Sequence, residues 1–138
     1  MVSNKMDGLL ARIAEILAED QEYPLDGTLL HAELAEGMIG PSIFKDRGNH
    51  VLYRWADLRV LCDALQDLWY AQDPAQRWAE MEYFVRDGSF HVIYTYADEI
   101  DPEEDPLDRR ERVVQRHFGD KPIVYPPLPE DGEPHYEV

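Results

Sequence analysis

Apolar residues recur at helical spacing in two segments of the chain, residues 5–20 and 57–72. Intervals of three and four positions place them on one side of a helix, which is typical of an amphipathic helix that buries one face. The first segment contributes Met6, Leu9, Leu10, Ile13, Ile16 and Leu17, and the second contributes Leu58, Leu61, Cys62, Leu65, Leu68 and Trp69. We therefore expect two helices, with Cys62 as a small buried apolar residue.

The region between these helices favours extended structure. Short runs rich in apolar and β-branched residues, bounded by turn residues, predict three strands. The runs cover residues 28–34, 38–44 and 50–55. Gly40 and Pro41 interrupt the second run. Because proline cannot donate a ladder hydrogen bond, this pair indicates a sheet edge or a bulge.

Residues 78–96 carry the clearest pattern, a β-hairpin around Asp87 and Gly88. This dipeptide favours a two-residue type I′ turn, and such a turn fixes the register of both strands. The register pairs Arg86 with Ser89, Val85 with Phe90, Tyr83 with Val92, Met81 with Tyr94 and Ala79 with Tyr96. The last four pairs are apolar or aromatic and share one face, which we expect to be core.

The opposite face of the hairpin is mixed in character. It holds Glu80, Glu82, Phe84, His91, Ile93 and Thr95. Two interpretations stay open at this point. The face is a docking surface for a partner, or a helix or loop covers it and Phe84 with Ile93 forms a second, smaller core contact.

A third helix follows the hairpin. Asp105 suits its N-cap, Pro106 its first position and Gly119 its end. Beyond Lys121 the chain becomes proline-rich and then acidic. We expect one α+β domain over residues 1–121, with an antiparallel sheet of about five strands and helices packed mainly on one face, and a proline-rich acidic tail over residues 122–138.

The charge balance narrows the choice of partner. The chain has 29 acidic and 13 basic residues among 138, a net charge of −16. Such a surplus disfavours nucleic acid and anionic membranes as ligands and favours a cationic protein, although it also serves solubility alone. No apolar run is long enough to span a membrane and no signal peptide pattern is present, so we expect a cytoplasmic protein.

The sequence gives no enzyme signature. The acidic run at residues 98–105 lacks the spaced ligands and central glycine of an EF-hand, and no histidine or cysteine spacing suits zinc. Glu80, Glu82 and His91 are compatible with acid–base catalysis, but neighbouring surface acids are common without it. We predict neither metal, nor cofactor, nor catalytic residues.

Residues 78–119 resemble the YezG-type antitoxin and immunity family. The resemblance rests on a tryptophan-led strand, a turn ending in glycine before phenylalanine, a tyrosine-rich strand, an acidic loop ending in Asp-Pro, and an arginine-rich helix ending near glycine. These features are Trp78, Gly88-Ser89-Phe90, Tyr94-Thr95-Tyr96, residues 98–106, Arg109-Arg110 and Phe118-Gly119. The resemblance implies an immunity protein that neutralises a polymorphic toxin domain, often a nuclease.

Acidic residues and one aromatic residue are the candidate contacts with such a toxin. They are Glu80, Glu82, Phe84, Asp98, Glu99, Asp101, Glu103 and Glu104. Arg109, Arg110 and Arg112 follow the acidic run and can hold some of its carboxylates internally. The alternative function is an acidic regulatory or adaptor domain that binds a cationic protein unrelated to a toxin.

Overall fold

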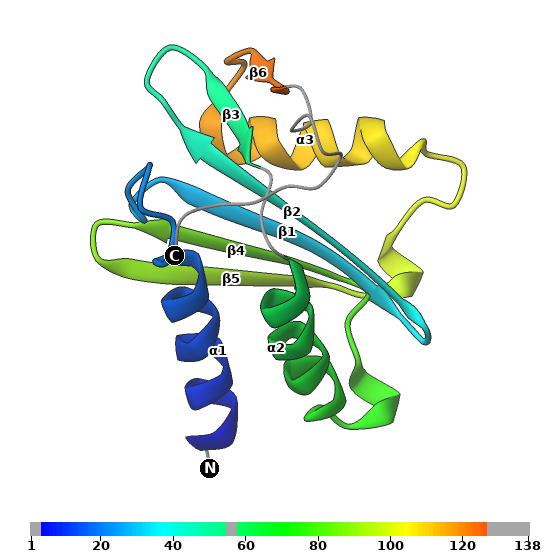
Figure 1. Cartoon of the computed structure of the whole chain (residues 1–138). Helices are drawn as coiled ribbons and strands as arrows, with labels where there is room; N and C mark the ends of the chain where they lie inside the picture. Colours follow the sequence, from blue (N-terminus) through cyan, green and yellow to red (C-terminus); the bar gives the residue numbers. More distant parts are fainter. Residues whose placement is uncertain (1–3, 55–57, 127–138) are drawn as a thin grey trace.

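A computed structural model describes residues 4–54 and 58–126 (Figure 1). The elements of these ranges are α1 (Asn4–Leu17), β1 (Thr28–Ala35), β2 (Met38–Asp46), β3 (Val51–Arg54), α2 (Leu58–Tyr70), η1 (Pro74–Gln76), β4 (Glu80–Arg86), β5 (Ser89–Thr95), η2 (Ala97–Glu99), α3 (Pro106–Phe118) and β6 (Ile123–Val124), where η marks a 3₁₀-helix. The prediction for residue 55 lies outside the described residues, as does the tail beyond residue 126.

The strands form one sheet in the order β5-β4-β1-β2-β3-β6. All neighbours are antiparallel except β3 and β6, which are parallel. The expected α+β fold is confirmed, with six strands rather than about five. The added strand, β6, comes from the start of the segment that we expected to be tail, where Pro122 also accepts a backbone hydrogen bond from Val51.

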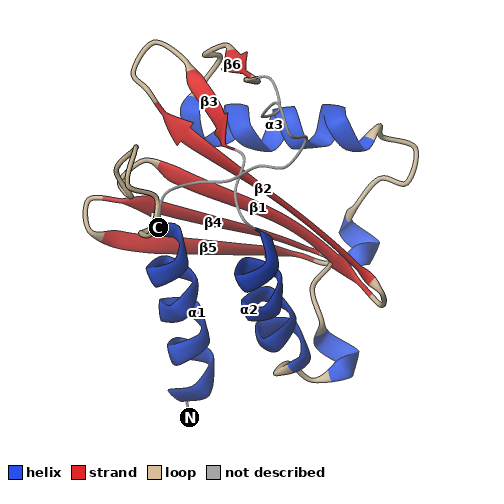
Figure 2. Cartoon of the chain, viewed as in Figure 1, coloured by secondary structure: helices blue, strands red, loops and turns tan. Residues whose placement is uncertain are grey.

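Helices cover both faces of the sheet, two on one face and one on the other (Figure 2). The two-residue period of β1 separates the faces: Leu30 belongs to the core under α1 and α2, and Leu29 to the core under α3. The larger core takes the first predicted helical stripe and, from the second, Leu61, Leu65, Leu68 and Trp69. Cys62, which we expected to be buried, is half-buried and lies outside this core. The smaller core joins Leu29, Phe44, Val51, Val113, Val114 and Phe118, with Phe84, Tyr53 and Ile123 at its border.

The hairpin has the predicted register. Arg86 faces Ser89 and Tyr83 faces Val92, and the ladder continues in step from end to end. Asp87 and Gly88 have φ values of 55° and 78°, as a type I′ turn requires. The turn residues and the apolar alternation therefore specify the same pairing.

Pro41 lies where the edge interpretation placed it. β2 pairs with β1 over its whole length, but its pairing with β3 covers only Ile43 to Asp46. Within residues 4–54 and 58–126, the half of β2 that contains Pro41 therefore pairs with β1 alone, which agrees with an edge position for a residue that has no N–H to donate.

The third helix has the predicted caps. The side chain of Asp105 accepts hydrogen bonds from the backbone N–H groups of Leu107 and Asp108, and Gly119 ends the helix with a φ of 78°. Leu107 is 60 % exposed, so the buried stripe of α3 begins later, at Val113.

The docking of α3 on the second face gives a stability prediction. Phe118 is 7 % exposed, and we expect Phe118→Ala to lower the free energy of unfolding by about 3 kcal/mol, because it leaves a cavity in the smaller core. Leu107→Ala on the same helix is the matched control, with an expected loss below about 0.5 kcal/mol. Denaturant unfolding measures both, and equal losses would contradict the packing described here.

Candidate partner-binding groove

Two of the predicted contact residues, Glu80 and Glu82, are buried. Both lie on the face of β4 that α3 covers, and each is 1 % exposed. This face is the mixed face of the hairpin, so the interpretation in which a helix covers it is the one that the structure supports for these two residues. Their carboxylates point to internal partners.

Glu80 is held by a cation and a histidine. Arg109 of α3 donates two hydrogen bonds to it, from Nη2 to Oε1 at 2.7 Å and from Nε to Oε2 at 2.9 Å. Nε2 of His31 lies 2.7 Å from Oε2. Burial acts to raise the pKa of Glu80, but the hydrogen bonds from His31 and Arg109 outweigh it and lower the pKa to about 2.

Glu82 is bound in a similar way about two turns further along α3. Arg116 pairs with Oε2, and Nε2 of His117 lies 2.7 Å from Oε1. Phe84, the third predicted residue on this face, packs against the rings of His117 and Phe118, at centroid distances of 4.9 and 5.5 Å. All three side chains therefore contribute to the attachment of α3.

Sequence reasoning missed the role of His31. Alternation along β1 places His31 on the same face as Leu29. In the antiparallel pairing of β1 with β4, His31 lies opposite Glu82 and therefore beside both glutamates. Two patterns in the sequence could have indicated these ion pairs. Arg109 and Arg116 are spaced to lie on one side of a helix, and Glu80 and Glu82 alternate on the strand that precedes it. Nothing in the sequence alone joins these two patterns.

His31, Glu33 and Glu80 form a possible metal-ligand cluster. Each offers one ligand atom, and these atoms lie within 4.8 Å of one another. Both carboxylate oxygens of Glu80 are already engaged: Oε1 accepts a hydrogen bond from Arg109, and Oε2 is within hydrogen-bonding distance of both Arg109 and His31. A divalent ion would have to displace a guanidinium that neutralises the same carboxylate, so the donor set does not suit a metal and we assign none.

The acidic run divides into anchored and exposed carboxylates. Arg109 and Arg112 both bind Glu104, as the sequence suggested for this helix. Asp101 accepts a backbone hydrogen bond from Glu103. Asp98, Glu99, Asp101 and Glu103 are exposed, and none of them forms an ion pair with a residue that the structure describes.

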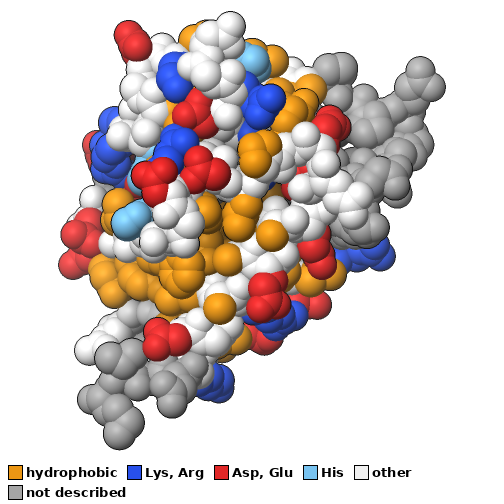
Figure 3. Space-filling model, turned by 90° about the vertical axis from the view of Figure 1, so that its left-hand side faces the viewer, with side chains coloured by type: hydrophobic (Ala, Val, Ile, Leu, Met, Phe, Trp, Pro, Cys, Tyr) orange, Lys and Arg blue, Asp and Glu red, His pale blue; other side chains and the backbone are white. Residues whose placement is uncertain are grey.

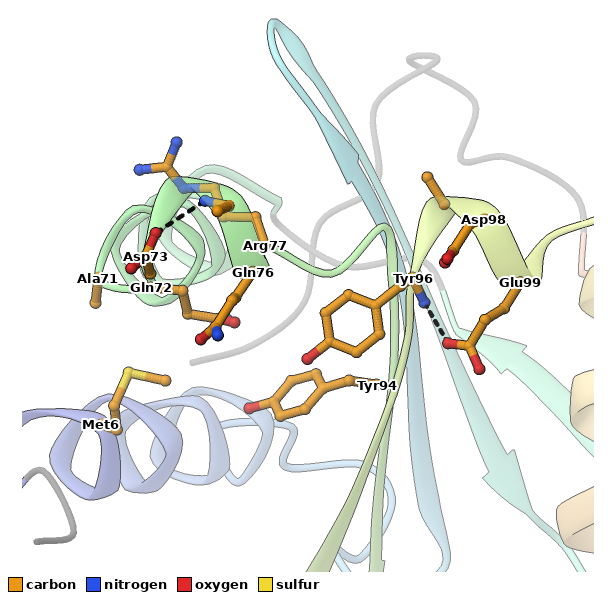
Figure 4. A pocket seen from close by; sticks show the side chains of 12 residues that line it. Met6, Ala71, Gln72, Asp73, Gln76, Arg77, Tyr94, Tyr96, Asp98 and Glu99 are labelled. Carbon is orange, nitrogen blue, oxygen red and sulfur yellow. Dashed lines mark hydrogen bonds between the residues drawn. The ribbon is translucent and has the colours of Figure 1, made fainter.

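Asp98 and Glu99 border a groove between the end of the hairpin and the first two helices. The groove has a volume of about 1200 Å³ and runs between Met6 of α1, the segment 71–77 after α2, and the segment 94–99. Figure 4 shows Tyr94 and Tyr96 projecting from the end of β5 toward Met6 and Gln76. The floor is therefore aromatic, and carboxylates stand at its border.

Some polar groups of the groove form hydrogen bonds within the protein, and one buried group does not. Asp73 accepts a hydrogen bond from the backbone of Ala75, and Glu99 accepts one from the backbone of Tyr96 (Figure 4). Arg77 donates to the carbonyls of Trp69 and Tyr70. Nε2 of Gln72 is buried and has no acceptor among the described residues.

This arrangement suits the binding of a cationic group beside an apolar one. Three carboxylates, Asp73, Asp98 and Glu99, border the groove, while its one arginine is directed to backbone carbonyls and stacks at 4.8 Å on the ring of Tyr70. Tyrosine rings offer both apolar area and a face that attracts cations. Among the described residues that line the groove, none is a nucleophile with an adjacent base.

The fold and the groove together define a class, an acidic α+β domain with a tyrosine-lined, carboxylate-bordered groove. No protein-family model matches the chain, and no curated protein matches it. The resemblance to YezG-type proteins stays a prediction. None of the helices in residues 4–54 and 58–126 has the length and apolar character needed to cross a membrane.

The carboxylate of Glu80 gives a pH prediction. Because its folded pKa of about 2 lies below the ordinary value of 4.5, its ionisation stabilises the fold above pH 4.5, and this contribution is lost as pH falls toward 2. We expect Glu80→Gln to be destabilised at neutral pH, and the difference from the wild type to shrink between pH 4.5 and 2.

The measurement is denaturant unfolding over this pH range. Leu65→Ala is the control, because it removes apolar contact in the other core and no titrating group, so its difference from the wild type is expected to stay constant. A Glu80→Gln difference that is equally constant would contradict the pairing of Glu80 with Arg109 and His31.

Proposed function

We propose that this chain is an immunity-type protein that binds and neutralises a cationic toxin domain, and that the groove with its border of carboxylates is the centre of the interface. The contacts assigned to the partner are Asp98, Glu99, Asp101 and Glu103 together with Tyr94 and Tyr96. Glu80, Glu82, Phe84 and Glu104 support the interface from within by holding α3.

One observation carries the proposal: the chain uses its cations internally and leaves carboxylates exposed around an aromatic groove. Nine of the 13 basic residues form ion pairs within the described ranges. They are Arg12, Lys45, Arg54, Arg77, Arg86, Arg109, Arg112, Arg116 and Lys121. None of these ion pairs involves a carboxylate that borders the groove: Arg77, which lines the groove, pairs with Glu36 and donates to backbone carbonyls.

A basic nuclease domain fits this surface. Nucleases carry cationic surfaces because they bind phosphates, and an acidic inhibitor can occupy the same groups. The exposed carboxylates would speed encounter and fix orientation, while buried aromatic contacts with the tyrosines would supply most of the affinity. This division of roles agrees with the position of the acids at the border and the rings on the floor.

The histidines and acids of this chain favour binding over catalysis. Glu80 and Glu82, which sequence reasoning considered with His91 as a possible acid–base set, are saturated by Arg109 and Arg116. His91 lies on β5 and pairs with Phe84 in the ladder. No carboxylate of this set is free to exchange a proton with a substrate.

The direct test is neutralisation in bacteria. The toxin to use is the C-terminal domain of a secreted protein encoded beside the gene for this chain. We expect that domain to arrest growth when expressed alone, and growth to recover when this chain is co-expressed. Persistent arrest, with no complex on gel filtration, would overturn the proposal. A chain that fails to neutralise but binds basic proteins through the groove would be an adaptor.

The role of charge placement gives a second prediction. The double variant Asp98→Lys with Glu103→Lys is expected to lower the association rate with the toxin domain roughly tenfold at low salt, because steering charges act through the on-rate. The control, Glu15→Lys with Glu111→Lys, changes net charge equally at exposed positions on α1 and α3. Equal losses in a stopped-flow or biosensor experiment would mean that net charge matters and the groove does not.

A further inference from the structure

We propose that β5 receives an extended, lysine- or arginine-bearing segment of the partner as an added strand of the sheet. This inference rests on the proposed function and specifies its mode of binding. The surface consists of the open edge of β5 and the adjoining groove. The occupant is an extended segment with apolar residues in its middle and basic residues near its ends.

The first step is the open edge itself. β5 is the outermost strand and pairs only with β4 among the described elements (Figure 1). Arg86 and Ser89 flank the two-residue turn as a hydrogen-bonded pair, so Ser89, His91 and Ile93 direct their backbone groups toward β4. Alternation then directs the N–H and C=O groups of Phe90, Val92 and Tyr94 outward, where a further strand would bind.

The second step is that this edge lacks the usual protection. Proteins guard exposed edges with charged residues, proline, bulges or very short strands. β5 reads Ser-Phe-His-Val-Ile-Tyr-Thr, without a lysine, arginine, acid or proline, in a chain of which 30 % is charged. Its ladder is continuous, without a bulge. The opposite edge, β6, is protected by its length of two residues.

Exposed apolar side chains accompany the open backbone. Phe90 is 39 % and Ile93 is 46 % exposed, one on each face of β5. The turn of the hairpin points to the left in Figure 1, and the side of the molecule seen from there carries a broad apolar area with acidic side chains at its borders (Figure 3). An added strand would cover apolar surface on both of its faces.

Charge complementarity selects the occupant. Acidic residues stand near both ends of β5: Asp87 in the turn, and Asp98 with Glu99 after the strand. A segment along β5 would place its end residues beside these carboxylates and its groove-facing side chains against Tyr94 and Tyr96. A second copy of this chain fits poorly, because antiparallel pairing of two β5 strands would bring acidic ends together and double a net charge of −16.

The probe for this proposal is a short acetylated peptide of alternating valine and threonine with two lysines at each end. We expect it to bind and to slow hydrogen exchange, measured by NMR, at the amides of Phe90, Val92 and Tyr94. The amides of His91 and Ile93 are expected to be slow already in the free chain. Absence of binding, or binding without this alternating protection, would overturn the proposal.

Three matched comparisons isolate the strand contact. A peptide N-methylated at alternate positions is expected to lose binding, and so is one with glutamate in place of lysine. Val92→Pro removes an outward N–H, whereas Val92→Ala shortens the same side chain and keeps it. We expect affinity to be roughly tenfold weaker for the proline variant than for the alanine variant, as loss of one or two hydrogen bonds implies. Equal affinities, or equal binding of the N-methylated peptide, would refute strand addition.

The same amides distinguish the remaining outcomes. Protection that increases with the concentration of the chain alone would show a second copy on β5 and overturn the assigned occupant. If the chain neutralises its toxin while the β5 amides stay unprotected in the complex, this inference fails and the proposed function stands. If the peptide protects them but no toxin is neutralised, the surface stands and the proposed function fails.

Discussion

The closure of α3 over Glu80 and Glu82 is the interaction on which the second face of the sheet depends. Glu80 and Glu82 occupy alternate positions of β4, on the face that α3 covers, and their carboxylates are almost completely buried. Burial of this kind is strongly unfavourable without matched cations, and removing one partner of such a pair typically costs about 3–5 kcal/mol. Arg109 and Arg116, both on α3, supply these cations. The buried glutamates, which would be unfavourable alone, therefore bind α3 to the sheet through ion pairs.

This use of arginine affects the whole surface. A chain with a surplus of acidic residues could distribute its arginines and lysines evenly over the surface, which would lower the repulsion between neighbouring carboxylates throughout. Here the cations of α3 are directed to the sheet and to Glu104, and Lys45 is buried beside Asp20, with its pKa lowered to about 8 chiefly by burial. Among the residues that the structure describes, the carboxylates that border the groove consequently form no ion pair.

Local patterns predicted the elements well, because each is specified by neighbours in sequence. The turn at Asp87 and Gly88 determines the hairpin register, and Asp105 with Gly119 determines the ends of α3. The position of α3 was not predictable in this way. Its apolar stripe fits either face of a sheet, and the choice depends on pairing between Arg109 and Glu80, which are 29 residues apart. For the same reason Glu80 and Glu82 were expected at the interface although they lie beneath α3.

The position of α3 also bears on the interface that we propose at β5, because it covers the centre of the second face of the sheet. α1 and α2 lie on one face of the sheet and α3 on the other, and in the described part of the chain the edge of β5 and the groove beside it are not covered by these helices. An edge that is uncharged, unbulged and partly apolar is a hazard for a protein that stays free in solution, since it invites pairing with any extended chain. Strong negative charge beside that edge repels further copies of the same acidic chain and attracts basic segments. Under the proposed mode of binding, the two features together would favour a basic strand over a second acidic copy of this chain.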